Sequence, residues 1–203
     1  MSKSTPAPFL TRNCPPVKPS DYKTHCMIDL ETLGNRPGCI TVSIGAVLFT
    51  QFEILEDFYQ LIDTVDAQNR GLIPDAGTVI WWMKQSNEAR AALSDPDNLP
   101  LHSALNKFSA WLSHEQDPAK ITLWGNGADF DLPVIIAAYH ACGLDVPWRF
   151  WNHRCFRTLK NLYDPAKILE PKREGTHHNA LADAKHQARH LQEIAARHQF
   201  ILC

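Results

Sequence analysis

The sequence predicts an α/β fold whose sheet begins with antiparallel strands, and three features of the chain support this prediction. Residues 26–31, 39–49 and 52–62 are rich in apolar, β-branched or aromatic residues, with Gln51 near the turn between the last two. Such segments are typical of a strand followed by a β-hairpin. The pattern then becomes helical, and a short apolar run at residues 121–124 indicates one further, buried strand. Strands and helices in this order favour a layered α/β architecture.

The helices are predicted from apolar spacing and capping residues. Residues 132–142 are nearly all apolar, with Pro133 in the first turn and Gly143 directly after the end, a pattern that indicates a buried helix. The last helix is expected to begin after Asn179, a favourable N-cap, and to bury small apolar residues at three- and four-residue spacing. Further helices are expected at residues 78–85, 87–93, 103–112 and 157–163.

Length, charge and composition describe one folded domain. The chain has 203 residues and a formal net charge of −2, whereas a protein that coats long duplex DNA is usually strongly basic. An enzyme that binds only a strand end needs a smaller basic surface, and the net charge is compatible with such an enzyme.

Residues 1–22 hold several prolines and no apolar periodicity, so we expect a flexible tail there and the folded domain in residues 23–203.

Cysteine usage and hydropathy indicate a cytoplasmic protein without membrane association. No apolar run approaches the roughly 18 residues that cross a bilayer, and no basic start followed by an apolar stretch marks a secretory signal. The six cysteines are widely and irregularly spaced, with no C-x-x-C pair. This spacing favours reduced thiols.

Asp29 and Glu31 are the first candidate site. They stand two residues apart at the end of an apolar segment, and side chains at that spacing in a strand point to the same face. Two adjacent carboxylates repel each other, and a hard cation such as Mg²⁺ or Mn²⁺, which takes oxygen ligands, would offset the repulsion. A solvated strand end is the alternative for this pair alone.

Two further segments carry acidic residues at the start of predicted helices. Asp129 and Asp131 precede the apolar helix at residue 132, where helix capping explains at least one of them. His178 and Asp183 flank the start of the last helix. Their five-residue spacing does not place both on one helical face, so it does not match an H-E-x-x-H zinc site; a histidine outside the cluster, above a fixed carboxylate, is compatible with it.

In this order, D-x-E, N-x-x-x-F-D and H-x(4)-D resemble the signature of the DEDDh exonucleases, which remove nucleotides from 3' ends on a ribonuclease H-like fold. The resemblance covers roughly residues 24–195. A narrower likeness, to DexA-type phage exonucleases and RNase AS-type exoribonucleases, rests on Trp81-Trp82, on the polar segment at residues 85–90 and on residues 150–158. It implies a ribonuclease H-like fold with a mixed central sheet flanked by helices.

The resemblance also implies residue roles. It assigns metal binding to four carboxylates: Asp29, Glu31, Asp131 and Asp183. It assigns the general base to His178, and Asp131 is preferred to Asp129 because it follows the aromatic residue. Substrate contacts are expected from Thr32, Leu33, Asn126, Phe130 and Trp81.

The implied reaction is stepwise 3'-5' hydrolysis of single-stranded nucleic acid, DNA or RNA, to nucleoside 5'-monophosphates. Two divalent ions, Mg²⁺ or Mn²⁺, would supply positive charge and lower the pKa of a bound water, and a histidine base suits neutral pH. Single-stranded 3' ends are the expected partner, and a homodimer is possible.

Aromatic and basic residues are candidates for holding the strand. The candidates for base stacking are Trp81, Trp82, Trp148 and Trp151, and those for phosphate contacts are Arg149, Arg154, Arg157, Lys172 and Arg173. The alternative that most of these tryptophans belong to the core stays open. Two rival functions also remain: a catalytically inactive nucleic-acid-binding module on the same fold, and a zinc-stabilised domain using residues such as Cys155 and His153.

Overall fold

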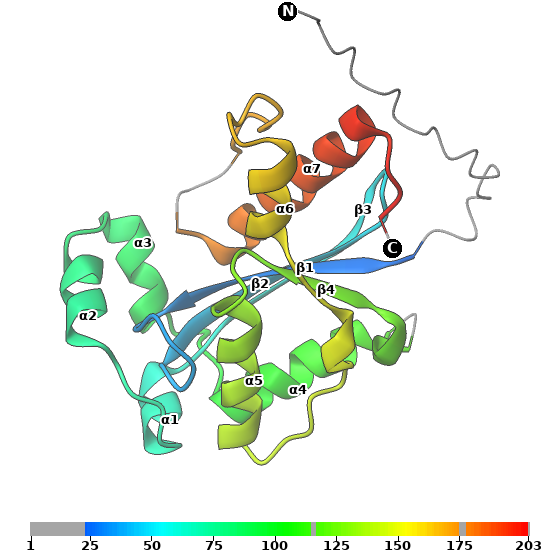
Figure 1. Cartoon of the computed structure of the whole chain (residues 1–203). Helices are drawn as coiled ribbons and strands as arrows, with labels where there is room; N and C mark the ends of the chain where they lie inside the picture. The colour runs from blue at the N-terminus through cyan, green and yellow to red at the C-terminus, as the bar shows by residue number, and fades with distance from the viewer. Residues whose placement is uncertain (1–22, 115–116, 175–177, 203) are drawn as a thin grey trace, which may run out of the picture.

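The structure is a computed structural model that describes residues 23–114, 117–174 and 178–202 (Figure 1). The predicted tail at residues 1–22 lies outside the described residues. Within the described part of the chain, no helix is long and apolar enough to cross a membrane.

A five-stranded mixed sheet forms the centre, in the order β3-β2-β1-β4-β5. Its strands are β1 (His25–Thr32), β2 (Thr41–Phe49), β3 (Ile54–Leu61), β4 (Thr122–Gly125) and β5 (His153–Cys155). β1 pairs antiparallel with β2, and β2 pairs antiparallel with β3. β4 pairs parallel with β1, and β5 pairs parallel with β4. The predictions of an antiparallel start and of a mixed central sheet are confirmed.

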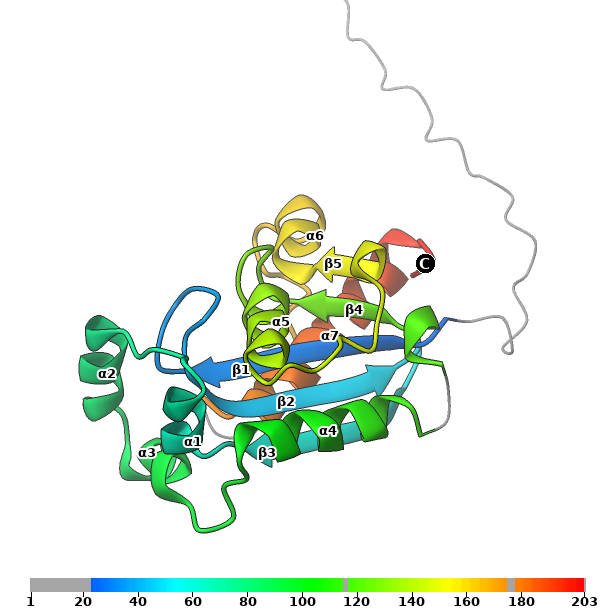
Figure 2. The same ribbon diagram turned by 90° about the horizontal axis from the view of Figure 1, so that it is seen from below.

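Helices cover both faces of this sheet. They are α1 (Thr64–Asn69), α2 (Ala76–Met83), α3 (Asn87–Ala91), α4 (Leu101–Leu112), α5 (Asp131–Ala141), α6 (Phe156–Tyr163) and α7 (Ala180–His198). Short 3-10 helices lie at Ala92–Ser94, Pro118–Lys120 and Phe150–Asn152. α4 and α5 lie on one face, α6 and α7 on the other, and α1, α2 and α3 gather near the carboxyl end of β1 (Figures 1 and 2).

Alternation along β1 divides its side chains between two cores. Cys26 and Ile28 pack in the core that contains α4 and α5, whereas Met27 packs in the core that contains α7. Successive side chains of a strand point to opposite faces. Asp29 and Glu31 therefore continue the Met27 row and face α7, as their two-residue spacing predicts.

A close approach of backbones brings the start of α7 to this row. Gly45 is the residue of β2 that pairs with Asp29, and a Cβ atom at position 45 would lie 2.1 Å from the carbonyl carbon of Ala180. Glycine inside a strand often marks such an approach. The missing side chain lets the first turn of α7, which carries Asp183, lie directly over the strand pair beside Asp29.

Two elements were not predicted from the sequence. β5 has three residues, the polar sequence His-Arg-Cys, and is held by parallel pairing with β4. α1 has six residues and begins after Asp63, whose carboxylate accepts hydrogen bonds from two backbone amides. Both are too short for an apolar period to appear, so tertiary pairing and a local cap define them instead.

Candidate active site

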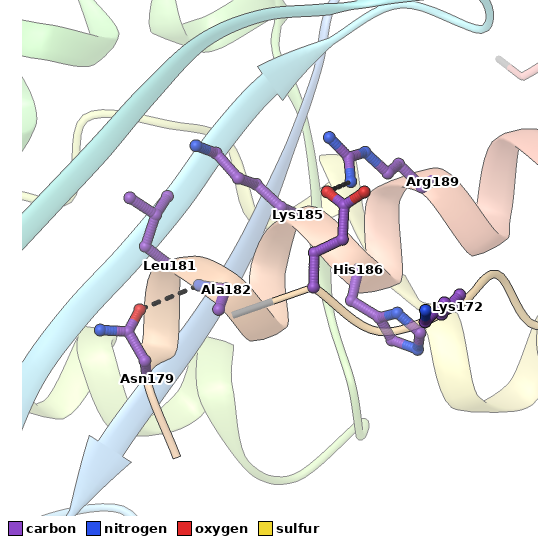
Figure 3. Close-up of a pocket in the computed structure, with 8 residues that line it drawn as sticks. Lys172, Asn179, Leu181, Ala182, Lys185, His186 and Arg189 are labelled. Carbon is purple, nitrogen blue, oxygen red and sulfur yellow. Dashed lines mark hydrogen bonds and ion pairs between the residues drawn. The ribbon is translucent and has the colours of Figure 1, made fainter. Parts of the chain in front are cut away.

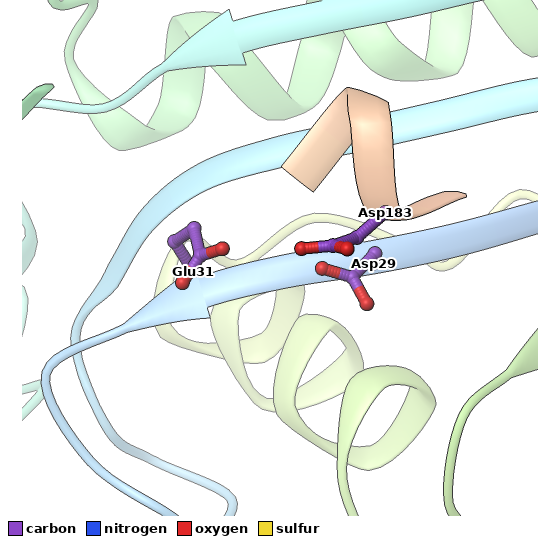
Figure 4. A group of neighbouring side chains, drawn as sticks. All are labelled: Asp29, Glu31 and Asp183. Atoms are coloured by element: carbon purple, nitrogen blue, oxygen red, sulfur yellow. The ribbon is translucent and has the colours of Figure 1, made fainter. Parts of the chain in front are cut away.

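Three carboxylates from two elements meet at the carboxyl end of β1. Asp29 and Glu31 come from β1, and Asp183 comes from the first turn of α7. One ligand oxygen from each lies within 4.8 Å of the others, and Figure 4 shows the three side chains turned toward a common space. The sheet register and the close approach at Gly45 thus join residues that are far apart in the sequence.

The cluster disfavours its own ionisation. Burial, followed by the charges of Asp131 and Glu31, raises the pKa of Asp29 well above its ordinary value. Burial and then the charge of Asp131 raise the pKa of Glu31 to about 7. Both effects penalise the charged carboxylates. A divalent cation among these oxygens would reverse the penalty, and carboxylate oxygens are the ligands that Mg²⁺ and Mn²⁺ prefer.

Asp131 is buried beside the cluster and has a second set of contacts. Its Oδ1 accepts a hydrogen bond from the backbone amide of Leu30 at 3.3 Å, and its Oδ2 accepts one from the amide of Asn126 at 2.8 Å. The carboxylate therefore joins the ends of β1 and β4 beyond their last paired residues, Met27 and Trp124. Burial raises the pKa of Asp131 to about 6, although these amides act to lower it.

Asp131, the fourth predicted metal ligand, thus lies near the other three carboxylates but does not belong to the group that they form. Among the described residues, this group consists of Asp29, Glu31 and Asp183, which each place one carboxylate oxygen within 4.8 Å of the others. Each oxygen of Asp131 still has lone-pair capacity beyond one hydrogen bond. Its role as a ligand stays a prediction. Asp129, by contrast, is exposed.

Two residues that touch the carboxylates complete the site. Gln187 Nε2 donates a hydrogen bond to Asp29 Oδ1 at 2.7 Å, and Arg173 forms an ion pair with Asp183. Sequence reasoning missed Gln187, although it stands four residues after Asp183 and so on the same side of α7. Arg173 was expected to contact phosphate rather than a carboxylate.

A pocket of about 500 Å³ opens next to Glu31. Its lining residues are Leu30, Glu31, Thr32, Gly34, Asn35, Asp75, Gly77, Thr78, Trp81 and Phe130. Three predicted substrate contacts, Thr32, Phe130 and Trp81, therefore lie around one space. The ring of His178 packs edge-on against Trp81, with ring centroids 4.8 Å apart. His178, the predicted base, therefore contacts one of the residues that line this pocket.

The remaining predicted contacts lie close by. Leu33 is partly buried against the core, and its amide donates to the carbonyl of Ile40 at 2.8 Å. The side-chain oxygen of Asn126 is buried and has no hydrogen-bond partner among the described residues. Nucleotide contacts of both residues stay predictions.

The four tryptophans that were candidates for base stacking form one buried pair and one exposed pair. Trp82 is 2% exposed, and its Nε1 donates to the carbonyl of Thr32 at 2.8 Å. Trp148 is 4% exposed, and its Nε1 donates to His153 Nε2 at 2.9 Å. Their candidacy for base stacking is wrong, because both rings are in the core. Trp81 and Trp151 are 39% and 61% exposed and remain available for stacking.

A second pocket, of about 490 Å³, also has Phe130 in its lining. It shares Asn35 and Phe130 with the first pocket and also contains Arg157 and Thr158. The charge of Arg157 acts to lower the pKa of Asp131. A basic residue thus stands beside the site, as a phosphate-binding role requires.

The zinc alternative finds no support in the donor set. The group of potential metal ligands within the described residues is made of carboxylates, with no histidine or cysteine. Structural zinc sites are built mainly from Cys and His.

Comparisons with known proteins agree with this geometry. Residues 24–195 match the family described as the 3'-5' exoribonuclease Rv2179c-like domain. An exodeoxyribonuclease of Enterobacteria phage T4 is 26% identical over 155 residues, which are 65% of this chain and 68% of the phage protein.

Solved structures of nucleases share the fold. The nuclease domain of 3'hExo, a DEDDh family member bound to rAMP, aligns with a TM-score of 0.61 at 16% identity, over 90% of this chain and 96% of that one. Cell-death related nuclease 4 aligns with a TM-score of 0.60 at 14% identity, over 87% of this chain and 64% of that one.

DEDDh exonucleases depend on divalent metal ions, and this chain has an acidic cluster of three carboxylates. The family match spans nearly all of the described sequence, and it confirms the resemblance seen in the three motifs. The chain belongs to the 3'-5' exoribonuclease Rv2179c-like domain family and is a 3'-5' exonuclease with the DEDDh fold.

Proposed function

We propose that this enzyme hydrolyses single-stranded nucleic acid from the 3' end to nucleoside 5'-monophosphates, using two divalent ions and His178 as the general base. The observation that carries the proposal is the meeting of Asp29, Glu31 and Asp183 within 4.8 Å, beside a pocket that is open at the surface. The family description supports the direction of hydrolysis.

The donor set fits Mg²⁺ or Mn²⁺. Asp29, Glu31 and Asp183 would hold the ions, with Asp131 as the fourth carboxylate, and four negative charges balance two divalent cations. When bound, the ions supply positive charge to the phosphate oxygens and lower the pKa of water. The raised pKa values of Asp29 and Glu31 favour cation binding, because a cation stabilises the ionised carboxylates.

The residues around the cluster orient its ligands. Gln187 holds one oxygen of Asp29 through its hydrogen bond, which limits rotation of this carboxylate. The amides of Leu30 and Asn126 hold the two oxygens of Asp131, one each. Hydrogen bonds of this kind orient metal ligands and commonly matter nearly as much as the ligands themselves.

His178 would accept the proton of the attacking water. It precedes α7 and does not belong to the carboxylate group, so it is not needed to hold metal. Its ring packs against Trp81, which lines the first pocket. A general base contributes roughly 10²–10⁴-fold to the rate.

The first pocket is suited to the terminal nucleotide. Its volume of about 500 Å³ lies within the usual range for small-ligand sites, and Trp81 and Phe130 offer aromatic surfaces for a base. Base stacking on an aromatic ring stabilises binding by roughly 1–3 kcal/mol. The 3'hExo nuclease domain binds rAMP, which supports a nucleotide as the occupant here.

RNA and DNA both remain substrates to test. The family is named for exoribonucleases, whereas the phage relative is named an exodeoxyribonuclease. Matched single-stranded RNA and DNA, each with Mg²⁺, Mn²⁺ or EDTA, would measure the preference. The homodimer and the cytoplasmic location stay predictions, and sedimentation of the purified protein would test the first.

The test of the His178 assignment separates metal binding from catalysis. His178→Ala should bind Mn²⁺ with wild-type affinity in a calorimetric titration, yet hydrolyse a saturating strand at least about 100-fold more slowly. Wild-type turnover across a pH series would refute the assignment. Loss of activity in EDTA and in Asp29→Asn distinguishes an enzyme from the inactive binding module, for which no condition would give hydrolysis.

A further inference from the structure

Arg173 is a cation that contacts the carboxylate cluster. Its guanidinium Nη1 pairs with Oδ1 of Asp183. Its charge also acts to lower the pKa of Asp29, against the larger effects of burial and of the neighbouring acids that raise it. Arg173 therefore neutralises part of the negative charge that Asp29, Glu31 and Asp183 concentrate in one place.

The chain segment that carries Arg173, residues 164–174, is attached to α7 independently of this ion pair. The attachments are His190 Nε2 with Asp164 Oδ2 at 2.7 Å, His186 Nε2 with Glu170 Oε1 at 3.1 Å, and Arg189 Nη1 with Glu174 Oε2 at 2.5 Å. The pair of His190 and Asp164 is buried. Figure 3 shows His186 and Arg189 on α7 facing this segment.

These attachments mean that the Arg173 side chain is free to change partner while its backbone stays in place. Asp164 also accepts hydrogen bonds from the amides of Ile168 and Leu169 at 2.8 and 3.0 Å. The Arg173 side chain is 33% exposed, against 15% for Asp183. Water is therefore available to the guanidinium when it leaves Asp183.

We propose that Arg173 is the counter-ion of the metal-free site and competes with a divalent cation for Asp183. Metal binding then favours departure of the guanidinium, because the two cations share one carboxylate and repel each other at short range. This inference rests on the proposed function, since it takes the cluster as the metal site. Arg173 thus lowers metal affinity and stabilises the metal-free enzyme.

Competition links two measurable quantities. If Arg173 favours the metal-free state, its removal tightens metal binding and lowers the stability of the metal-free protein by the same free energy, while the metal-bound protein keeps its stability. We expect Arg173→Gln to bind Mn²⁺ about tenfold more tightly, within the usual range of such couplings. A tenfold change in affinity corresponds to about 1.4 kcal/mol, which should reappear as the loss of unfolding free energy in EDTA.

Lys172→Gln is the matched control. Lys172 is the neighbouring cation, and it forms no ion pair with any residue that the structure describes. Its removal changes the net charge by the same amount without touching Asp183. We expect its Mn²⁺ affinity and its metal-free stability to stay within about twofold and a few tenths of a kcal/mol of wild type.

The experiment is a calorimetric Mn²⁺ titration of full-length wild type, Arg173→Gln and Lys172→Gln, with no nucleic acid present. Urea unfolding in EDTA and in saturating Mn²⁺ accompanies it. Tighter binding and lower metal-free stability in Arg173→Gln alone support the competition. Equal or weaker binding in Arg173→Gln, or an equal gain in Lys172→Gln, overturns it and leaves the proposed function intact. If no variant, wild type included, binds Mn²⁺, the metal site itself is wrong and this inference falls with it.

Discussion

Replacing Gly45 with alanine should separate the two halves of the active site. The added Cβ atom would lie 2.1 Å from the carbonyl carbon of Ala180 and 2.2 Å from the amide nitrogen of Leu181. Both are backbone atoms at the start of α7, so no side-chain rotation relieves the overlap. The strand at Gly45 is paired on both sides, with Asp29 and with Tyr59, and the helix must therefore move.

The required movement can be worked out from these distances. An ordinary van der Waals contact of a Cβ atom begins at about 3.4 Å, so the start of α7 must shift by about 1 Å or more. Asp183 lies in the first turn of the helix and would move with it, away from Asp29 and Glu31. A misplacement of about 1 Å in a catalytic arrangement can cost on the order of 100-fold in rate. Overpacking should also cost roughly 1–3 kcal/mol of stability.

Steady-state hydrolysis of a labelled strand in Mn²⁺ measures the first effect, and urea unfolding measures the second. Val47→Ala is the control, because Val47 lies on the same strand and packs in the core that contains α7. It should lose roughly 1–3 kcal/mol by cavity formation yet keep most of the activity. Near wild-type turnover in Gly45→Ala, with the protein folded, would refute the role assigned to this close approach.

Two further predictions follow from buried groups. Asp131→Asn should abolish activity, whereas Asp129→Asn, at an exposed position, should lose a few-fold at most in single-turnover cleavage at saturating Mg²⁺; the reverse order would move the site to Asp129. Because one of the two amide donors to Asp131 loses its acceptor in the variant, a melting curve must accompany the assay. Burial lowers the pKa of His25 from 6.5 to about 4, so on acidification His25 becomes protonated in the unfolded chain at a higher pH than in the folded protein. The free energy of unfolding is therefore unaffected by His25 above pH 6.5, and it falls by about 3 kcal/mol as the pH drops through 6.5 towards 4. Urea unfolding at pH 7 and pH 4.5 should show a smaller loss in His25→Gln than in wild type, and identical losses would count against this explanation.

The sequence was sufficient to predict the strands and helices that have a clear apolar spacing or a strong capping residue. Residues 26–31 were predicted to form a strand, and the two-residue spacing then places Asp29 and Glu31 on one face before any partner is known. The apolar helix after Asp131 and the capped helix after Asn179 were predicted within one or two residues of their observed starts. Each of these elements is long or has a strong capping residue, so local preferences and tertiary packing agree.

What the sequence did not reveal depends on contacts between distant segments. Gln187 reaches Asp29 across 158 positions, and only the packing of α7 over β1 turns a polar helix residue into part of the site. Gly45 offered a signal, since glycine inside an apolar strand often marks a close backbone approach. The burial of Trp82 and Trp148 could not be read from composition, because a tryptophan with a partner for its N–H group packs in the core as readily as it stacks on a base.

The most direct test of the central claim uses a strand labelled at its 5' end, with either a free or a chemically blocked 3' end. With Mn²⁺ and a free 3' end, the products should shorten one nucleotide at a time, and the released material should be nucleoside 5'-monophosphate. The blocked strand should stay intact, and so should the free strand in EDTA or with Asp29→Asn. Internal fragments from the blocked strand would contradict the account, because they would show that the carboxylate cluster cuts within a strand and does not require a 3' end.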